Sequence, residues 1–471
     1  MFLALLLVLI QSHRYNKRRN IPINSKPQFD VGDWWTDTNG TFIQAHGGKI
    51  EFIENYNCFN NATKGCWLWC GEDDLHNTGS YGVKCYASTN LYVWENKGRA
   101  LFAHNMIPVR TNGLGNGIVN NMDNLRELKR RANLPKKGIR FTKGNDISDE
   151  DIDKARNFLK AYVTETDKDG NFVKFDEQSL LQAFVYLYEE YTVISRPKFL
   201  YNRKYNNYVI IFHSDGPRES DLVKWVKEGT PLPFKYGIEY NAMMGFAVSD
   251  SPFGPYKLVN VQRMHWVKGW HDYDPGMARD MGTYVDYNSE DSEDVAYVLY
   301  SSENNEYLYM SRLDDTFTTW SKVQGEAQDG IDFKARVIGE TTWREAPAIF
   351  RHKGYYYLMT SGTTGWSWNA AKYHRSTMLF GPYEDMGNPC EGDGSDRTFD
   401  SQPTYIIRYN AKKGQFIYLG DRFFRDDLFQ SRYVLLPIEL DDTNHKIKLH
   451  YTEHWSLDDV FSSNSESEDK K

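Results

Sequence analysis

The sequence is short of cysteine, of long apolar runs and of surplus positive charge. Only five of its 471 residues are cysteines, and after residue 10 no apolar stretch approaches the roughly 20 residues that a membrane-spanning helix needs. Acidic residues (64) outnumber basic ones (56), for a net charge of −8, and the basic residues are scattered along the chain. These shortages argue against a bundle of membrane helices and against a dominant nucleic-acid surface.

Aromatic residues, in contrast, are abundant. Phe, Trp and Tyr make up 15% of the chain, accompanied by 35 glycines. A chain with this much apolar surface cannot remain a solvated coil, so an all-disordered protein is excluded. The excess of Tyr and Trp favours β-structure and surfaces on which sugar rings stack.

The N-terminus carries one short apolar run, residues 2–10, followed by Gln11-Ser-His13. Nine residues cannot cross a bilayer, so we expect residues 1–19 to be a secretory signal peptide and the protein to be secreted or to enter the secretory lumen. A short membrane anchor is the alternative. It is favoured by the basic residues behind the run, Arg14, Lys17, Arg18 and Arg19.

The cysteine pattern agrees with export. The five cysteines are Cys58, Cys66, Cys70, Cys85 and Cys390. Cys66-Trp-Leu-Trp-Cys70 alternates like a strand and places both thiols on one face, whereas paired zinc knuckles are lacking. We expect one or two disulfides, with a zinc site or free buried thiols as alternatives. The sequons at Asn39 and Asn61 would be glycosylation acceptors in that compartment.

Dense aromatic and β-branched runs recur along the chain. They are Tyr208-Val-Ile-Ile-Phe-His213, Ala296-Tyr-Val-Leu-Tyr-Ser301, Tyr355-Tyr-Tyr-Leu-Met-Thr360 and Gln415-Phe-Ile-Tyr-Leu-Gly420. Such runs are typical of strands buried on both faces. The motif Phe253-Gly-Pro-Tyr256 is repeated as Phe380-Gly-Pro-Tyr383. Strand sets at these intervals predict an all-β fold, a β-propeller over residues 30–458, with a β-sandwich as the alternative.

Two segments depart from this pattern. Residues 120–190 place Leu, Ile and Phe at helical spacing, and Ser148-Asp-Glu-Asp151 offers an N-cap with acids in the first turn. We expect a mostly helical insertion there, packed outside the propeller. Residues 459–471 form an acidic, Ser-rich tail that we expect to be disordered.

Three carboxylates lie in apolar strand contexts: Glu72, Asp280 and Glu345. A buried acid is costly unless it is paired or used. Salt bridges with adjacent arginines, Arg279 and Arg344, are one explanation. A shared site is the other, because a proton-donating carboxyl and a second group that activates water are the minimum for glycoside hydrolysis.

Eight runs in order along the chain resemble glycoside hydrolase family 43, most closely its exo-β-1,3-galactanase (galactan 1,3-β-galactosidase) branch. They are Ile43-Gln-Ala-His-Gly-Gly48, Cys70-Gly-Glu72, Arg196-Pro-Lys-Phe-Leu-Tyr-Asn202, Ala278-Arg-Asp-Met281, Arg344-Glu-Ala-Pro-Ala348, Thr360-Ser-Gly-Thr-Thr-Gly-Trp366, Phe399-Asp-Ser-Gln-Pro403 and Ser431-Arg-Tyr-Val-Leu-Leu-Pro437. The resemblance covers about residues 30–110 and 192–458.

The resemblance implies a five-bladed propeller with an inverting site at one end of the central axis. Glu345 matches the general acid, and Asp280 matches the acid that orients it and keeps it protonated. Gln402 matches an amide proposed to hold the attacking water, acting by position and as an imidic tautomer rather than as an ordinary base. A buried amide that merely satisfies strand backbone is the alternative for Gln402.

The remaining matches concern the sugar. Glu72 and Thr364 match sugar-contacting positions, and Trp366 offers a stacking face unless it belongs to the core. Arg196 and Arg279 are expected to hold carboxylates in place. The sequence departs from the branch at Ser195, where a galactose-recognising Glu is usual; the preceding insertion, with Glu189 and Glu190, could supply a replacement acid.

We therefore expect an inverting exo-glycosidase for β-1,3-linked galactose or a related polysaccharide. Its partner would be a polysaccharide or oligosaccharide, with no nucleic acid, no cofactor and no metal motif. The alternatives are a non-catalytic carbohydrate-binding propeller with a degenerate site, favoured by Ser195, and a protein-interaction scaffold, which has no need of the acids.

Overall fold

The computed structural model of the chain describes residues 27–54, 56–59, 65–74, 80–102, 108–109, 117–118, 193–215, 242–262, 264, 277–287, 294–321, 334–336, 343–425 and 427–461. The expected signal segment, the expected helical insertion at 120–190, Glu189, Glu190 and the sequon at Asn61 lie outside these residues. Asn39 is described and exposed. Across the described ranges, no helix has the length and apolar character needed to cross a membrane.

The chain divides into two units. The smaller comprises Met1–Asp30 and His454–Lys471, and the larger is Val31–Glu453. In the smaller unit, β1 (Phe29–Asp30) pairs antiparallel with β26 (His454–Trp455), and α6 (Leu457–Phe461) follows.

Helix α6 corrects the boundary expected for the C-terminal tail. The expected disordered segment begins at residue 459, yet residues 459–461 are helical. Phe461 is buried, and its ring meets Trp455 edge-on at 6.1 Å. This apolar contact stabilises α6 as far as Phe461, so the expected disordered tail begins no earlier than residue 462.

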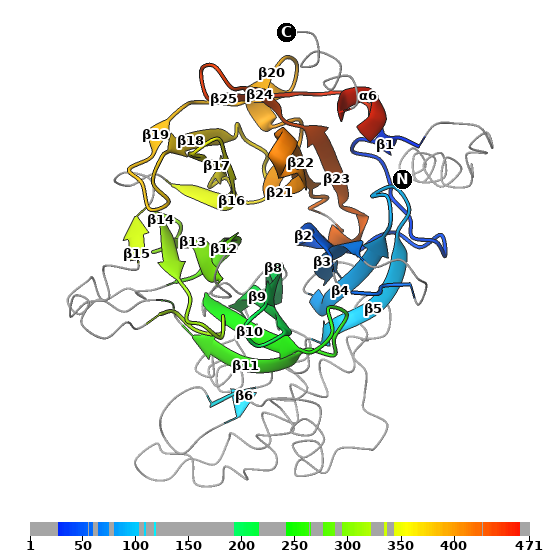
Figure 1. The fold of residues 1–471 in the computed structure, drawn as a ribbon, viewed down its shortest axis with the longest axis vertical. Coiled ribbons are helices and arrows are strands. Elements are labelled where there is room, and N and C mark those ends of the chain that lie inside the picture. Colours follow the sequence, from blue (N-terminus) through cyan, green and yellow to red (C-terminus); the bar gives the residue numbers. More distant parts are fainter. Residues whose placement is uncertain are drawn as a thin grey trace, which may run out of the picture. The chain divides into compact units, whose positions relative to one another are not determined.

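Five antiparallel sheets form a ring in the larger unit, as Figure 1 shows. From the centre outward, blade I is β2 (His46–Ile53), β3 (Cys66–Asp74), β4 (Ser80–Ser88) and β5 (Glu95–Phe102). Blade II is β8 (Val193–Asn202), β9 (Asn207–Asp215), β10 (Met243–Ser249) and β11 (Lys257–Gln262). Blade III is β12 (Arg279–Asp286), β13 (Val295–Ser302), β14 (Tyr307–Arg312) and β15 (Lys334–Arg336). Blade IV is β16 (Arg344–His352), β17 (Tyr355–Gly362), β18 (Lys372–Ser376) and β19 (Glu384–Asp385), and blade V is β21 (Gln402–Asn410), β22 (Gln415–Arg422) and β23 (Arg432–Pro437).

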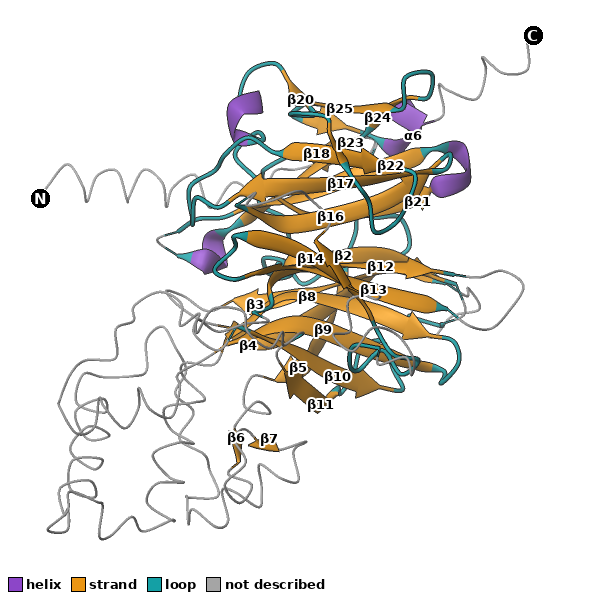
Figure 2. Ribbon diagram, turned by 90° about the vertical axis from the view of Figure 1, so that its left-hand side faces the viewer, coloured by secondary structure: helices purple, strands orange, loops and turns teal. Residues whose placement is uncertain are grey.

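Smaller elements complete the described larger unit. They are β6 (Pro108–Val109), β7 (Gly117–Ile118), β20 (Cys390–Glu391), β24 (Glu439–Asp441), β25 (Lys446–His450) and the single turns η3 (Ser395–Arg397), η4 (Ala411–Lys413) and η5 (Leu428–Gln430). In Figure 2, strands make up most of the described part of the chain.

The ring closes through its innermost strands. Strand β2 contacts both β8 and β21, β12 contacts β8 and β16, and β16 contacts β21. The first strand of every blade therefore lines one central axis, which is the arrangement of a five-bladed propeller. The β-propeller expected from the recurring runs is confirmed.

The recurring aromatic runs are the second strands of their blades. They lie in β9, β13, β17 and β22. Residues 208–215 of β9 are all buried, and their side chains enter two different apolar clusters, one shared with blade I and one with blade III. A second strand is covered by both neighbouring blades, which explains why it lacks the polar alternation of a half-exposed strand.

The repeated Phe-Gly-Pro-Tyr motif marks equivalent places in two blades. One copy joins β10 to β11, and the other joins β18 to β19. The Tyr256 hydroxyl donates to the carbonyl of Pro252 (3.2 Å), and the Tyr383 hydroxyl donates to the carbonyl of Leu379 (2.9 Å). In both blades the tyrosine thus closes the link to the outermost strand in the same way.

Four cysteines form two disulfides, Cys58–Cys66 and Cys70–Cys85, so the expected disulfides are confirmed and a zinc site at this cluster is wrong. Cys70 and Cys85 lie opposite each other on β3 and β4. All four half-cystines belong to the apolar cluster between blades I and II. Cys390 is a buried free thiol, and burial raises its pKa to about 12.

Replacing both Cys70 and Cys85 by alanine should destabilise the protein by about 3 kcal/mol, because the bridge closes a loop of 15 residues in the unfolded chain. Chemical denaturation measures the change, and Cys390→Ala is the control that removes a buried sulfur without a bridge. Peptide mapping without reduction should find both bridges, and free thiols at Cys70 and Cys85 would contradict the assignment.

Candidate functional site

Each of the five inner strands carries a β-bulge near its first residues. The register with the second strand shifts between His46 and Lys49, Ser195 and Lys198, Arg279 and Gly282, Glu345 and Ala348, and Pro403 and Tyr405. A bulge bends its strand and re-aims the local side chains. The same irregularity in every blade therefore turns one end of the axis into a ring of converging side chains.

Four of the bulges contain a residue in the left-handed region. These are Gly47 (φ 57°), Arg196 (54°), Asp280 (39°) and Ala346 (54°). A non-glycine residue there costs on the order of 1–3 kcal/mol and persists only where the surroundings dictate it. Of the expected site residues, Arg196 and Asp280 lie at these positions, and Arg279 and Glu345 lie directly beside them. They are thus part of the inner strands rather than of the segments before them.

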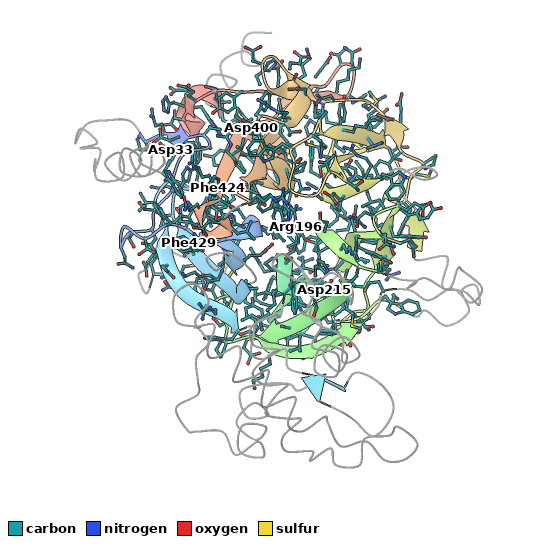
Figure 3. The ribbon with its side chains drawn as sticks, turned by 180° about the vertical axis from the view of Figure 1, so that it is seen from behind. Asp33, Arg196, Asp215, Asp400, Phe424 and Phe429 are labelled. Atoms are coloured by element: carbon teal, nitrogen blue, oxygen red, sulfur yellow. A yellow bond between two sulfur atoms is a disulfide. The ribbon has the colours of Figure 1, made fainter. Side chains whose placement is uncertain are left out.

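Arg196 occupies the middle of this ring, as Figure 3 shows. Its buried guanidinium lies 3.5 Å from Asp280 (Nε to Oδ1) and donates to the amide oxygen of Gln402. It also donates to the carbonyl of Pro403 (3.1 Å) and to the hydroxyl of Thr404 (3.4 Å). Asp280 is therefore paired with an arginine of the neighbouring blade, and the arginine adjacent in sequence, Arg279, lies at the start of β12 opposite Ser301.

Glu345 and Gln402 are in direct contact. The Gln402 amide nitrogen donates to Glu345 Oε1 (2.9 Å) and to the Ser361 hydroxyl (2.8 Å). Because guanidinium only donates, Arg196 sets the amide with its oxygen toward itself and its nitrogen toward Glu345. The Arg344 side chain, the simple ion-pair explanation for Glu345, donates instead to the hydroxyl (2.9 Å) and carbonyl (2.6 Å) of Thr360.

This contact differs from the spacing expected for an inverting site. A water between acid and activator needs carboxyl-to-partner separations of about 6.5–9.5 Å. The structure brings Glu345, Gln402 and Asp280 to one end of the axis but leaves no such gap between Glu345 and Gln402. The reason is local: the amide that Arg196 orients finds its second partner in the Glu345 carboxylate.

Glu72 lies beside Arg196 on the blade I side. Its Oε1 accepts the backbone N–H of Arg196 (2.7 Å), and its Oε2 accepts the hydroxyl of Ser195 (3.4 Å). Burial raises the pKa of Glu72 to about 7, although the Arg196 N–H and guanidinium oppose the shift. Gly47 is required here, because a Cβ at that position would come within 2.4 Å of Glu72 Oε1.

Two buried charged residues near Arg196, Asp421 and Lys198, were not singled out by the sequence analysis. Asp421 on β22 accepts from the backbone N–H of Gly47 (2.9 Å) and lies 3.9 Å from Arg196 Nη1. Burial would raise the Asp421 pKa, but His46 and Arg196 hold it below its usual value. Lys198 donates to the carbonyls of Gly47 and Arg196, and burial lowers its pKa to about 7. Asp421 directly follows the strand-like run that ends at Gly420, and Lys198 lies within the run Arg196-Pro-Lys-Phe-Leu-Tyr-Asn202, but neither was singled out as a site residue.

The two remaining expected sugar contacts lie on the loop after β17. The Thr364 hydroxyl is exposed and accepts from the Asn369 amide (2.7 Å). Trp366 is 41% exposed, so it is not a core residue, and its ring meets Phe423 edge-on at 5.3 Å. The same Phe423 ring lies 5.7 Å from the Arg196 guanidinium, which connects this loop to the centre of the site. Among the residues that the structure describes, no group of three or more His, Cys, Asp or Glu side chains could hold a metal ion.

A family model and several solved structures are similar to this chain. The model of glycosyl hydrolases family 43 matches residues 205–395, which run from β9 to η3. This match confirms the resemblance of the eight runs to glycoside hydrolase family 43. No curated protein matches the chain.

Solved structures of this family share the fold. A family 43 β-1,3-galactosidase with galactodeoxynojirimycin is 24% identical with a TM-score of 0.58, covering 91% of this chain and 100% of that one. An exo-β-1,3-galactanase variant from Phanerochaete chrysosporium with β-1,3-galactotriose is 24% identical with a TM-score of 0.56, covering 91% and 68%. An exo-β-1,3-galactanase from Clostridium thermocellum is 21% identical with a TM-score of 0.57, covering 91% and 66%.

The raised pKa of Glu72 makes stability depend on pH. The folded protein binds a proton at Glu72 up to about pH 7, whereas the unfolded carboxyl releases it near 4.5, so this contribution is full below 4.5 and is lost as pH rises through 7. Glu72→Gln removes this dependence. As the pH rises from 5 to 8, the free energy of unfolding of Glu72→Gln should therefore rise by about 2 kcal/mol relative to that of wild type.

Thermal unfolding across that range measures the difference. Glu384→Gln is the matched control, because its carboxyl is 63% exposed at the rim. A Glu72→Gln curve parallel to wild type at every pH would show that Glu72 ionises normally.

Proposed function

We propose that the chain is an exo-acting glycosidase that hydrolyses β-1,3-linked galactose, or a closely related linkage, with inversion. The observation that carries the proposal is the group of side chains at one end of the axis. The buried Glu345 carboxyl accepts a hydrogen bond from the Gln402 amide at Oε1, and Asp280 pairs with Arg196, which also binds that amide. The proposal is further supported by the fold, which the chain shares with β-1,3-galactosidase and exo-β-1,3-galactanase structures.

In the proposed mechanism, Glu345 is the general acid that protonates the leaving glycosidic oxygen. Asp280 contributes a negative charge that Arg196 holds in place, which favours the protonated form of Glu345. An incoming sugar separates Gln402 from Glu345, and a water takes the vacated position beside the amide. Gln402 then orients this water for attack on the opposite face of the sugar, while its own orientation stays set by Arg196. The proton that the attacking water loses passes to solvent, and a proton from solvent restores Glu345 to its acid form.

The substrate in this proposal is a neutral sugar, held by hydrogen bonds to the polar groups of the site. Ser195 presents a hydroxyl that already donates to Glu72, so a single carboxyl remains where the related branch has two. Glu72, with a pKa near 7, can donate or accept a hydrogen bond to a sugar hydroxyl around neutral pH. Trp366, partly exposed, supplies a ring face for the next sugar.

A non-catalytic carbohydrate-binding propeller is the second candidate. It is favoured by one observation, the 2.9 Å contact that closes the space between Glu345 and Gln402. Sugar binding without turnover would establish this alternative. We further propose that the protein is secreted, which its two disulfides support because such bonds persist in oxidising compartments.

Glu345→Gln should lower turnover of β-1,3-galactan at least 100-fold, because general acid catalysis typically supplies 10²–10⁴-fold and the amide has no transferable proton. An aryl β-galactoside, whose leaving group needs little protonation, should lose much less. Galactose release measures the rates, and NMR of the first product anomer reports inversion or retention.

The control is Glu384→Gln on the rim, which should leave both rates unchanged. Full hydrolysis of the natural polymer by Glu345→Gln would eliminate Glu345 as the acid. A β-anomer as the first product would eliminate inversion, whatever the rate.

A further inference from the structure

The turn between β13 and β14 is fastened to the start of β16, the strand that carries Glu345. The Ser301 hydroxyl donates to the carbonyl of Arg344 (3.1 Å), and the backbone N–H of Trp343 donates to the carbonyl of Glu306 (3.3 Å). Between these two bonds, the amide nitrogen of Asn305 donates to Glu345 Oε2 (3.0 Å). Blade III thus holds the first residues of blade IV by three hydrogen bonds, one of which ends on the carboxylate itself.

The turn adopts an unfavourable backbone to make this contact. Glu303, Asn304 and Asn305 are consecutive left-handed residues, with φ values of 47°, 56° and 69°. Asparagine tolerates this region better than most residues, but three in succession are uncommon. Such strain persists where surrounding structure over-determines it, and it concentrates at functional sites. The side chain that the strained turn delivers to the site is Asn305.

The chemistry of Glu345 gives this contact a consequence. Both of its oxygens accept an amide N–H, Oε1 from Gln402 and Oε2 from Asn305. A general acid needs a proton on one oxygen, and an oxygen that carries the proton on the side of an N–H donor loses that hydrogen bond. Gln402 has a second acceptor in Ser361, whereas the turn that bears Asn305 is tied to β16 on both sides of Glu345.

We propose that Asn305 is a positioning residue for the general acid: by holding Oε2, it directs the catalytic proton to Oε1, the oxygen that faces Gln402. This inference rests on the proposed function, in which Glu345 is the acid. Asn305 does not touch the reacting atoms in this scheme. It acts by fixing which face of the carboxyl presents the proton and by limiting how readily the carboxyl is protonated, since an N–H donor favours the ionised form.

Charged groups lie near Glu345 on several elements. Arg196 approaches from β8 and Arg344 from its own strand, and each interacts electrostatically with Glu345. Asp280 of β12 pairs with the same Arg196, and Glu303 shares the turn with Asn305. None of these groups changes in Asn305→Gly, so a shift in the titration of Glu345 in that variant reports the amide contact.

The experiment compares three variants of the whole protein. Asn305→Gly removes the donor and keeps a residue that accepts the left-handed backbone, and Asn305→Asp replaces the donor with a carboxylate. Asn304→Gly is the matched control, because the neighbouring side chain is exposed on the same strained turn. Hydrolysis of β-1,3-galactan is followed from pH 4 to 9, and the Glu345 side-chain carboxyl is followed by ¹³C NMR, assigned by its loss in Glu345→Gln.

We expect the alkaline limb of the rate profile and the carboxyl titration to move upward together, by about 0.5–1 pH unit in Asn305→Gly and about 1–2 in Asn305→Asp. On the polymer, kcat of Asn305→Gly should fall roughly tenfold with KM unchanged, and an aryl galactoside should lose less. Asn304→Gly should follow wild type in both readouts.

A folded Asn305→Gly or Asn305→Asp protein whose carboxyl titration is unchanged would overturn the inference. Equal shifts in Asn304→Gly would also overturn it, since they would come from the turn rather than from the amide. If wild type hydrolyses no glycoside but the titration shifts as expected, the hold of Asn305 on Glu345 stands and the glycosidase proposal fails.

Discussion

The buried guanidinium of Arg196 is the interaction on which the site depends. Burial would lower its pKa, but Asp280, Asp421, Glu72 and Glu345 surround it and raise the pKa instead. Its hydrogen bonds reach the amide of Gln402 and the backbone of β21, and its own N–H holds Glu72. Removal of this charge would leave several carboxylates without their counter-ion, which in a buried site costs several kcal/mol.

The propeller places these groups through a β-bulge that is repeated in every blade. Each inner strand starts with a bulge, and the residue at the bulge differs from blade to blade: glycine in blade I, arginine in blade II, aspartate in blade III and alanine in blade IV. A common backbone shape therefore carries different chemistry around the axis. Because neighbouring blades pack through apolar second strands, the rigid core can tolerate the strain that these positions impose.

The hydrogen bonds around Glu345 bear on its ionised and its protonated form. With Gln402 and Asn305 both donating to it, the carboxyl is satisfied in its ionised form. In the proposed mechanism substrate displaces the Gln402 contact only, because Asn305 is tied in by the turn between blades III and IV. Protonation of the acid and creation of the space for water would then be a single event, since both need the same hydrogen bond to open.

Local sequence determined much of this protein. Aromatic runs predicted the strands that prove to be the second of their blades, and alternation placed Cys66 and Cys70 on one face. Apolar strand contexts singled out Asp280 and Glu345, and the resemblance of eight runs to a known family added Gln402. Only the tertiary structure decided which site side chains contact one another. Asp280 and Arg196 are far apart in the chain, as are Asn305 and Glu345, and no local spacing records their approach. Closure of the ring sets these partnerships, because it brings the starts of all inner strands to one end of the axis and leaves each buried charge only the partners found there.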